Sequence, residues 1–495
     1  MGIHLVFFHN LEFHRDELLY FSMGSHPAAG YASVPPMTGW IAFLMIRLMG
    51  YSILAARLVP ALGAGVMVVL TDAITRELKG NAFARIVVAV TIVIMPFSLR
   101  IFYLFQPVFL EYLDWSLILY LVLRYVNTRN SKLILLIGLV AGLGLLTKYL
   151  VGLLILSLAL VIPFTRHRRV FTEKNLYIAI AIAVLIFLPN VLWQLTHGLP
   201  VLYHMNALAS RQLVHVDRIS ILTDLVVFSG PGFLLFIPGL LFLLISNRLK
   251  SYRMFAWVAI FVVGILVALK GKSYYAVGIL PFLMAAGGIF LEKVLKKTFS
   301  RVFTVALITI VGLLLLPAGV PVFGPAGLEK YFRILTSVIK NTDILRFEDG
   351  QIHPLPQDYS DMIGWNELTQ VTAELYRSLP DKQSTRIYAE NYGEAGAINV
   401  IGRQYGLPQP LCFAESFLYW NPREFPVEIK TLIYINEERP GKDVYEMFEE
   451  VTPMGSITQP LSREYGTTVY LCTHPRKSFN AAWKDLVNMR KNPFR

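Results

Sequence analysis

The feature that most constrains this chain is a series of apolar stretches between Leu54 and Phe323. Most of them are roughly 17 to 25 residues long, enough to cross a hydrocarbon core of about 30 Å. With 55% hydrophobic and only 16% charged residues, the chain is too apolar for a soluble globular protein. We therefore expect a polytopic α-helical membrane protein. The expected spans are residues 54–75, 86–105, 107–126, 133–147, 149–165, 176–195, 222–246, 254–269, 274–292 and 302–323.

The connections between these spans alternate in charge. Every second connection is rich in Lys and Arg, with 17 cations in five loops, whereas the intervening connections hold six. Because cytoplasmic loops retain Lys and Arg, the rich set is predicted to lie inside and the poor set outside. The net charge of +12 thus indicates membrane topology and gives no reason to expect a nucleic-acid partner. We expect a multi-pass protein of the inner membrane with an extracytoplasmic C-terminal region.

Two domains are expected, at residues 1–323 and 324–495. The first holds the spans and an outer loop over residues 10–53, in which Met37–Met49 is amphipathic and suited to the membrane interface. In the second, strands and helices are both predicted, so it is expected to be an α/β domain. The strands are at residues 386–389, 431–435 and 468–472, and the helices at 366–377 and 394–404.

The two ends of the chain raise separate questions. Met1–Phe8 is apolar but too short to span a membrane and lacks a signal-peptide pattern. We expect either that a further helix precedes Met1 or that this end dips into the membrane without crossing it. Near the other end, Cys412 and Cys472 either form a disulfide in an oxidising compartment or remain buried thiols.

Two adjacent carboxylates, Asp16 and Glu17, lie in the first outer loop. A carboxylate at the apolar edge of a membrane loses solvation and becomes a better base, as removal of a proton from an acceptor hydroxyl requires. The alternative is an ordinary helix start at Asp16-Glu17-Leu18-Leu19-Tyr20, where acids favour the amino end.

Glu111 and Asp114 lie one turn apart near the outer end of a span. Acids inside membrane segments cost roughly 2.5 to 3.5 kcal/mol each on insertion scales, so they normally face a cavity or a partner. Glu111 is the stronger functional candidate because it lies nearer the outer surface by about one helical turn. The alternative is a structural ion pair with Arg100 or Lys148.

A cationic hairpin, Lys270-Gly271-Lys272-Ser273-Tyr274-Tyr275, joins two spans on the predicted outer side. Lysine binds phosphate as a point charge, and tyrosines favour the membrane interface. The segment is predicted to hold the head of an anionic lipid, with Arg211 and Arg218 as weaker candidates of the same kind. The alternative is interfacial snorkelling of the lysines.

Metal and nucleotide signatures are absent from the sequence. His14, His26, His204 and His215 lie in outer loops without His-x-x-x-His spacing or a His/Cys cluster, so no metal site is predicted. No cofactor is expected to be required, although a divalent metal stays open. Without a Walker loop, a dinucleotide fingerprint or Gly-x-Ser-x-Gly, the chemistry is not expected to use a cytoplasmic nucleotide.

Several short motifs occur in order along nearly the whole chain. They are Arg15-Asp-Glu-Leu-Leu-Tyr20, Gly30-Tyr31 with Pro35-Pro36, Gly142-Leu-Gly-Leu-Leu-Thr-Lys-Tyr149, Leu188-Pro-Asn-Val-Leu-Trp-Gln194, Gly271-Lys-Ser-Tyr-Tyr275 and Asn391-Tyr-Gly-Glu-Ala-Gly-Ala397. With these motifs the chain resembles the bacterial GT-C glycosyltransferases of family 39, the group related to protein O-mannosyltransferases and to the lipid A aminoarabinose transferase.

The resemblance implies transfer of a hexose or pentose from a polyprenyl-phosphate donor to a hydroxyl of a lipid, glycan or protein. It implies that Asp16 is the catalytic carboxylate, that Glu17 is its neighbour in the same motif and that Glu111 is the second acid. Lys270 and Lys272 fall in the segment that such enzymes place near the lipid phosphate. A base for the acceptor and positive charge for the departing phosphate also suit the interpretation from the residues alone.

Two other functions stay open. A transporter or flippase of lipid-linked sugars would share the spans and buried acids, but it is expected to show inverted repeats and broken helices near the midplane, whereas the distinctive polar residues here gather at one face. A membrane-anchored binding or assembly protein would work through its outer domain, and Asp16→Asn would then leave its activity intact.

Overall fold

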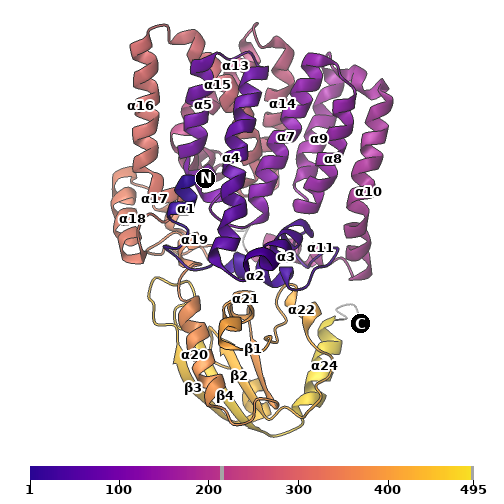
Figure 1. The fold of residues 1–495 in the computed structure, drawn as a ribbon, viewed down its shortest axis with the longest axis vertical. Coiled ribbons are helices and arrows are strands. Elements are labelled where there is room, and N and C mark those ends of the chain that lie inside the picture. Colours follow the sequence, from indigo (N-terminus) through magenta and orange to yellow (C-terminus); the bar gives the residue numbers. More distant parts are fainter. Residues whose placement is uncertain (212–216, 492–495) are drawn as a thin grey trace. The chain divides into compact units, whose positions relative to one another are not determined.

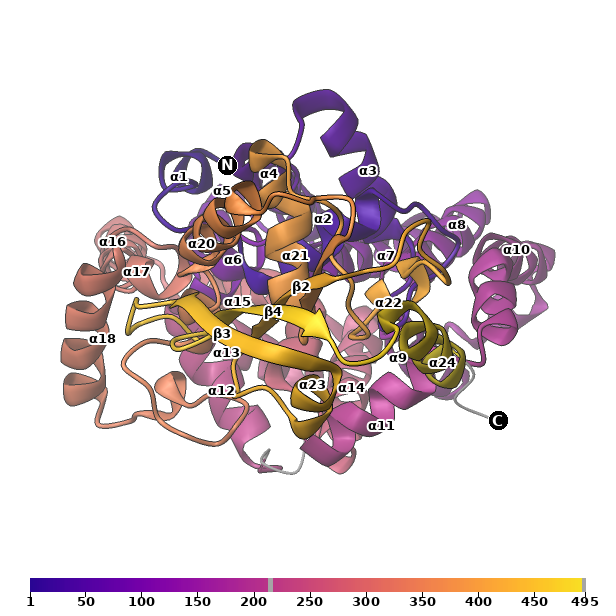
Figure 2. The same cartoon turned by 90° about the horizontal axis from the view of Figure 1, so that it is seen from below.

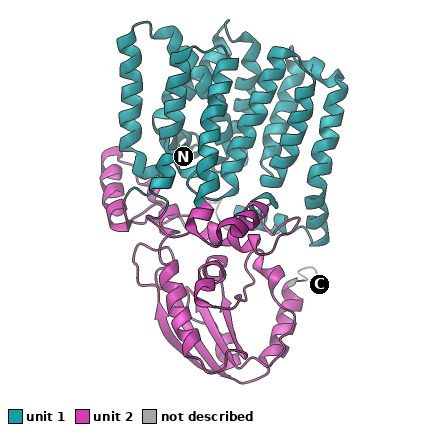
Figure 3. Ribbon diagram, viewed as in Figure 1, with its two compact units in different colours: residues 1–8, 34–38, 57–322 teal, residues 9–33, 39–56, 323–495 magenta. Residues whose placement is uncertain are grey.

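A computed structural model describes residues 1–211 and 217–491 and divides the chain into two compact units (Figure 3). Unit 1 comprises Met1–Phe8, Val34–Thr38 and Arg57–Val322, and unit 2 comprises His9–Ser33, Gly39–Ala56 and Phe323–Arg495. One of the divisions falls between Val322 and Phe323. Most of the first outer loop, residues 10–53, belongs to unit 2.

Unit 1 is a bundle of helices (Figure 1). Its helices are α1 Gly2–Val6, α4 Ile53–Glu77, α5 Ala82–Ile94, α6 Pro96–Ile101, α7 Pro107–Thr128, α8 Lys132–Thr147, α9 Val151–Val161, α10 Lys174–Thr196, α11 Pro200–Arg211, α12 Ser220–Ser229, α13 Phe233–Ile245, α14 Arg253–Ala268, the 3-10 helix η6 Ser273–Ile279, α15 Leu280–Val294, α16 Thr298–Leu314 and α17 Leu316–Gly319. Among the described residues, five stretches are long and apolar enough to cross a membrane: Ile53–Glu77, Lys174–Thr196, Ser220–Ile245, Lys250–Ala268 and Ser273–Val294.

Several of the expected spans are interrupted in the structure, and two of the breaks have a clear local cause. The stretch at 86–105 becomes α5 and α6, because Pro96 stands in the first turn of α6 and cannot donate a backbone hydrogen bond to α5. The stretch at 222–246 bends at Gly230, whose φ of 50° lies in the left-handed region that glycine adopts without strain. Both breaks follow from local residue chemistry that hydropathy alone does not report.

Close helix contacts in unit 1 depend on small residues. A Cβ added at Gly239 of α13 would overlap the backbone oxygen of Leu283 on α15, and one added at Gly138 of α8 would overlap Ala179 on α10. In membrane bundles, small residues of this kind let backbones approach closely and gain van der Waals contact.

The five cation-rich connections gather at one end of unit 1. Arg248 donates to the backbone oxygen of Lys79 at 2.9 Å and pairs with Glu292 at 3.2 Å. His167 contacts Arg129 at 3.2 Å and the backbone oxygen of Ser251 at 3.0 Å. The cation-rich connections, which alternate with cation-poor ones along the sequence, therefore lie together in space within unit 1.

Unit 2 contains a four-stranded mixed sheet in the order β1-β2-β4-β3 (Figure 2). Strand β1 pairs with β2 in parallel, and the other two pairs are antiparallel. The strands are β1 Thr385–Ala389, β2 Thr431–Asn436, β3 Phe448–Ser456 and β4 Thr468–Pro475. The helices are α2 Arg15–Gly24, α3 Met37–Met49, α18 Pro325–Ile339, α19 Gln357–Ser360, α20 Trp365–Ser378, α21 Tyr392–Val400, α22 Phe417–Trp420, α23 Lys442–Met447 and α24 Phe479–Lys491.

The three predicted strands and two predicted helices of this unit are present, with α21 shorter than expected and followed by a separate 3-10 turn at Gly402–Tyr405. Strand β3 was missed. It is an edge strand whose register shifts between Pro453 and Gly455, and these two residues disfavour a strand in any sequence pattern.

A hydrophobic core joins the sheet of unit 2 to α24. Trp483 and Phe479 of α24 pack with Leu432, Tyr434 and Cys472 of the strands. Both Cys472 and Cys412 are buried and free, so the cysteines are buried thiols and the disulfide alternative is wrong.

Helix α2 of the first loop packs directly on α21 of the C-terminal region. A Cβ added at Gly396 would lie 2.7 Å from the Cβ of Leu18, so this glycine permits the close contact. Backbone bonds add to it, since Arg15 N donates to the oxygen of Asp361 at 3.0 Å and Ala32 N donates to the hydroxyl of Ser416 at 3.0 Å. Residues nearly 400 positions apart in the chain therefore build one unit.

Candidate active site

The start of α2 is a capping box. The backbone N–H of His14 donates to Glu17 Oε2 at 2.9 Å, and that of Asp16 donates to His14 Nδ1 at 3.1 Å. Glu17 is fully buried in this arrangement. The helix-start alternative is thus correct for Glu17, whose carboxylate satisfies backbone donors at the end of the helix.

Asp16 projects from the same turn and is half-buried. Its Oδ1 accepts a hydrogen bond of 2.9 Å from the hydroxyl of Tyr392, the first residue of α21 and 376 positions away in the chain. Burial, followed by the nearby charge of Asp16, raises the pKa of Tyr392 well above its usual range. Tyr392 therefore stays a neutral donor at physiological pH, and this partner of Asp16 is a hydroxyl without a charge.

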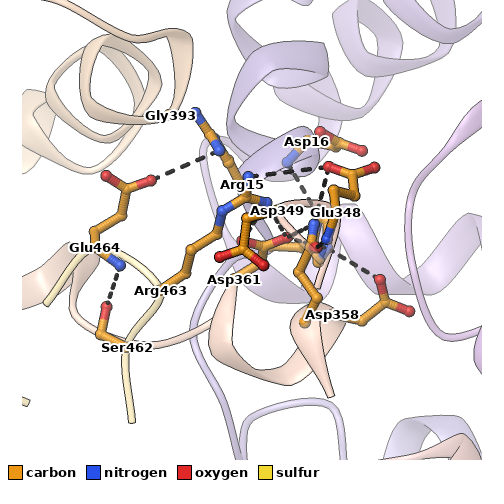
Figure 4. Close-up of polar contacts among 12 residues, drawn as sticks. Arg15, Asp16, Glu348, Asp349, Asp358, Asp361, Gly393, Ser462, Arg463 and Glu464 are labelled. Carbon is orange, nitrogen blue, oxygen red and sulfur yellow. Dashed lines mark hydrogen bonds and ion pairs between the residues drawn. The ribbon is translucent and has the colours of Figure 1, made fainter. Parts of the chain in front are cut away.

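Arg15, next to Asp16, pairs with a second acid, Glu464 (Figure 4). Its guanidinium carbon lies 4.5 Å from the centre of the Tyr392 ring, and its Nη1 lies 3.7 Å from Glu464 Oε1. Glu464 also accepts a hydrogen bond of 3.2 Å from the side chain of Asn391, which caps α21. The cation next to Asp16 in sequence is thus directed at the Tyr392 ring and at Glu464.

Further buried charges surround the start of α2. Asp361 lies 3.3 Å from Arg463 and 3.7 Å from His14, and burial raises its pKa against the opposing effect of these two groups. Burial, with a smaller effect of Glu464, also raises the pKa of Glu394 well above its usual range. Glu394 nevertheless accepts backbone hydrogen bonds from Glu390 and Asn391 at 3.0 and 3.1 Å.

A second cluster lies in unit 1, around Glu111 on α7. Its Oε2 forms a 2.9 Å ion pair with Lys148 Nζ, which follows α8. The same ammonium lies 5.1 Å from the ring centre of Tyr274 and 4.7 Å from that of Tyr275, both in η6. Glu111 and the two tyrosines were predicted as site residues, whereas Lys148 was considered only as a structural partner of Glu111. That pairing is present, and it brings three predicted residues around one cation.

Two of the motifs quoted from the sequence meet beside this cluster. The hydroxyl of Tyr149 donates to Asn190 Oδ1 at 3.0 Å and accepts from Gln194 Nε2 at 3.2 Å. On the other side of Glu111, the side chain of Asp114 contacts Thr147. The motif 142–149 therefore supplies Lys148 and the polar residues on both sides of it. The presence of Lys148 in this motif was the sequence signal that could have identified it as a site residue.

The remaining predicted cations are placed less specifically. Lys270 has a left-handed backbone with φ of 55° in the turn before η6, Lys272 is the N-cap of η6, and both are half-buried. Arg211 ends α11, and its side chain lies outside the described residues. The phosphate-binding roles of these three residues stay predictions.

The described residues contain no group of three or more His, Cys, Asp or Glu side chains arranged to hold a metal ion. Two of the predicted loop histidines have other contacts: His14 caps α2, and His26 stacks on Trp420 with ring centres 4.2 Å apart. A broad groove of about 1280 Å³ does exist in unit 2, lined in part by Asn10, Glu12 and Gln370, but Asp16 and Tyr392 are not among its lining residues.

Residues 33–193 match the family model for dolichyl-phosphate-mannose-protein mannosyltransferases. Two relatives from Rhizobium johnstonii are each 27% identical to this chain. One is the lipopolysaccharide core galacturonosyltransferase RgtA, matched over 197 residues, 39% of this chain and 38% of the relative. The other is the lipid A galacturonosyltransferase RgtD, matched over 204 residues, 40% and 42% respectively. The matched region thus spans about two fifths of each relative's length.

The fold is similar to a solved structure over almost its whole length. ArnT from Cupriavidus metallidurans, bound to undecaprenyl phosphate, superposes with a TM-score of 0.65 over 95% of this chain and 96% of that chain, at 13% identity. The same protein in its apo state gives a TM-score of 0.63. The expected fold class is therefore confirmed. The chain is a polytopic membrane protein of the GT-C type with a C-terminal α/β domain, and over residues 33–193 it matches the dolichyl-phosphate-mannose-protein mannosyltransferase family.

Proposed function

We propose that this protein is a membrane glycosyltransferase that moves a sugar from a polyprenyl-phosphate donor to a hydroxyl acceptor. The observation that supports this most directly is the state of the acid pair in the first loop. Glu17 is buried in the helix cap, whereas Asp16 is half-buried and hydrogen-bonded to the neutral hydroxyl of Tyr392. One carboxylate of the pair thus caps a helix, and the other accepts a hydrogen bond from a residue of α21.

In the proposed reaction Asp16 is the general base. It takes the proton of the acceptor hydroxyl while the acceptor oxygen attacks the anomeric carbon from the side opposite the phosphate. The bond between the anomeric carbon and the phosphate oxygen breaks, and polyprenyl phosphate leaves with that electron pair. The sugar configuration is inverted, and no covalent sugar–enzyme intermediate forms. Because phosphate is already an acidic leaving group, no acid is needed to protonate it.

A departing phosphate needs positive charge, and within unit 1 the cluster around Lys148 is our candidate for this role. Lys148 is the cation that the tyrosines and Glu111 hold in place, and Lys270 and Lys272 belong to the turn that leads into the same tyrosines. Fixed positive charge acts strongly on a developing anion where water is excluded. Glu111, paired with Lys148, is assigned to hold that lysine rather than to react with the sugar.

The side of the membrane follows from the charge distribution. The five cation-rich connections at one end of unit 1 are assigned to the cytoplasm. Lys148 and η6 belong to connections at the other end, so the reaction is placed on the outer face of the cytoplasmic membrane, with unit 2 extracytoplasmic. The relatives act on lipid A and on lipopolysaccharide core, which makes these the first acceptors to test. A transporter of lipid-linked sugars is not favoured, since the matched family and relatives are transferases.

The proposal is tested with full-length protein in proteoliposomes, a panel of labelled undecaprenyl-phosphate sugars and lipid A or core acceptors. Wild type should transfer label, and Asp16→Asn should lower kcat by about a thousandfold, within the range seen for a lost general base. Asp485→Asn, an exposed acid on α24, serves as the matched control and should transfer at the wild-type rate.

A parallel reaction with a chelator tests the expectation that no metal is required, and it should leave the rate unchanged. Transfer by Asp16→Asn at the wild-type rate, with the variant folded, would refute the assignment of the base. Absence of transfer by wild type with every donor, together with movement of the donor across the bilayer, would instead support the transporter.

A further inference from the structure

We propose that Tyr392 is a positioning residue for the base, so that the C-terminal domain takes a direct part in catalysis through α21. This inference rests on the proposed function, and it adds a residue from a part of the chain that neither the family match over 33–193 nor the acid motif covers. Its basis is a closed set of contacts between the first turns of α2 and α21.

The contacts form a continuous path that starts at the cap of α21, reaches α2 through Glu464, returns to α21 at Tyr392 and ends at Asp16 of α2. The side chain of Asn391 donates to Glu464 at 3.2 Å, and Glu464 pairs with Arg15 at 3.7 Å. The guanidinium of Arg15 covers the Tyr392 ring at 4.5 Å, and the Tyr392 hydroxyl donates to Asp16 at 2.9 Å. Each group in the path restricts the next one. The ring of Tyr392 is fixed from its face by Arg15, which leaves its hydroxyl aimed at the carboxylate.

Both helix starts are capped by side chains. Asn391 and Glu394 form a capping box on α21, as His14 and Glu17 do on α2. The helices touch closely at Gly396 and Leu18, one turn beyond the polar contacts. The hydrogen bond from Tyr392 to Asp16 therefore joins two capped helix ends, and it sets the direction of the carboxylate more firmly than a contact from a loop would.

The choice of tyrosine matters for the chemistry. A tyrosine hydroxyl is a directional donor, and its hydrogen bond of 2.9 Å orients the carboxylate of Asp16. Arg15, the cation next to Asp16 in sequence, pairs with Glu464. The contact from Tyr392 can thus hold the carboxylate of Asp16 in one orientation.

The test compares Tyr392→Phe with Tyr434→Phe in the full-length protein. Tyr434 is a matched control, because it lies in the same domain and donates to a different carboxylate, Glu390, at 2.8 Å. Using the undecaprenyl-phosphate sugar that wild type accepts, Tyr392→Phe should lower kcat by about ten- to a hundredfold, the scale of a misplaced catalytic group, with the donor KM within twofold of wild type. Tyr434→Phe should change neither constant.

Gly396→Ala provides a second perturbation that keeps Tyr392. Its Cβ would meet Leu18 and shift α2 against α21, so kcat should again fall while the donor KM holds. Gly324→Ala is the control, since nothing lies within 4 Å of its added Cβ. A selective fall in kcat in both folded variants supports the positioning role, and if one of them folds poorly the other carries the test.

Two results would overturn the inference. If Asp16→Asn is inactive while folded Tyr392→Phe turns over like Tyr434→Phe, Tyr392 does not position the base, although the proposed function stands. If Asp16→Asn transfers like wild type, the base itself is misassigned, and both proposals fail together.

Discussion

The two polar clusters of this protein compensate their charges in different ways. In unit 1 the carboxylate of Glu111 contacts a cation directly, in an ion pair of 2.9 Å with Lys148. In unit 2 the carboxylate of Asp16 contacts a neutral hydroxyl at the same distance, and the neighbouring cation pairs with another acid. A direct ion pair fixes both partners and stabilises each of them in its charged form, whereas a hydroxyl donor fixes an acid by a hydrogen bond alone.

The surroundings of the clusters explain this difference. Glu111 lies in a helix of a membrane bundle, where an unpaired acid is costly and a cation is the most effective partner. Asp16 lies at the first turn of a helix in a mixed domain, where backbone donors, a tyrosine and several charged side chains are available. The comparison assigns a holding role to Glu111 and a reactive role to Asp16, and the following variants test that assignment.

The largest effect is expected for Lys148→Met. Loss of a fixed positive charge near the phosphate should lower kcat/KM by at least about a hundredfold. The variant also leaves Glu111 buried without its cation, which should reduce the free energy of unfolding by about 3 kcal/mol. Transfer assays and thermal unfolding of the full-length protein measure the two effects.

The double variant Lys148→Met/Glu111→Gln separates structure from function. Removing both charges should restore most of the stability, because no unpaired charge is left, but it should not restore transfer. Lys297→Met, at an exposed position of the cation-rich end, controls for the loss of one positive charge. Recovery of transfer in the double variant would mean that the ion pair is structural only.

A smaller effect, on stability, is expected for Glu394→Gln. Because burial raises the pKa of Glu394 in the folded state, folding favours its protonated form. The stability that it contributes is full below the unfolded-state pKa and is lost as pH rises through the raised folded-state pKa. Gln imitates the protonated form and still accepts the two backbone hydrogen bonds. Between pH 5 and pH 8 the free energy of unfolding of the variant should therefore fall less than that of wild type, and we expect the two decreases to differ by about 1 kcal/mol.

Thermal unfolding across this pH range measures the difference. Glu374→Gln, an exposed acid on α20, should follow the wild-type curve. If the unfolding free energy of Glu394→Gln falls with pH as steeply as that of wild type, ionisation of Glu394 does not destabilise the folded protein. The charges around α21 would then be balanced as they are in unit 1.

The smallest effect is expected at Tyr274. Tyr274→Phe keeps the ring that lies 5.1 Å from Lys148, and should change the donor KM by less than twofold. Tyr274→Leu removes the ring and about 0.5 to 1 kcal/mol of cation–π attraction, so the donor KM should rise by about two- to fivefold. Equal effects of the two substitutions would indicate that the hydroxyl, and not the ring, is what the site uses.

Much of the fold could be predicted from local pattern. The spans followed from apolar length, the separation of charged ends from the alternation of Lys and Arg, and three of the four strands from apolar alternation. The misses have local causes: Pro96 divides one span, and Pro453 with Gly455 obscures an edge strand. Site residues were harder to predict, because the sequence alone does not distinguish a carboxylate that caps a helix from one that reacts.

The sequence by itself determined that this is a membrane protein with one cation-rich end, and that Asp16, Glu17, Glu111 and the Lys270–Tyr275 hairpin are its unusual polar residues. Hydropathy and charge act over a few neighbouring residues and can be read from them. Only the tertiary structure decided that Glu17 closes a helix cap, that Lys148 is the partner of Glu111, and that Tyr392 holds Asp16. Those contacts join residues up to 376 positions apart, and which side chains meet across such a distance depends on how the helices pack.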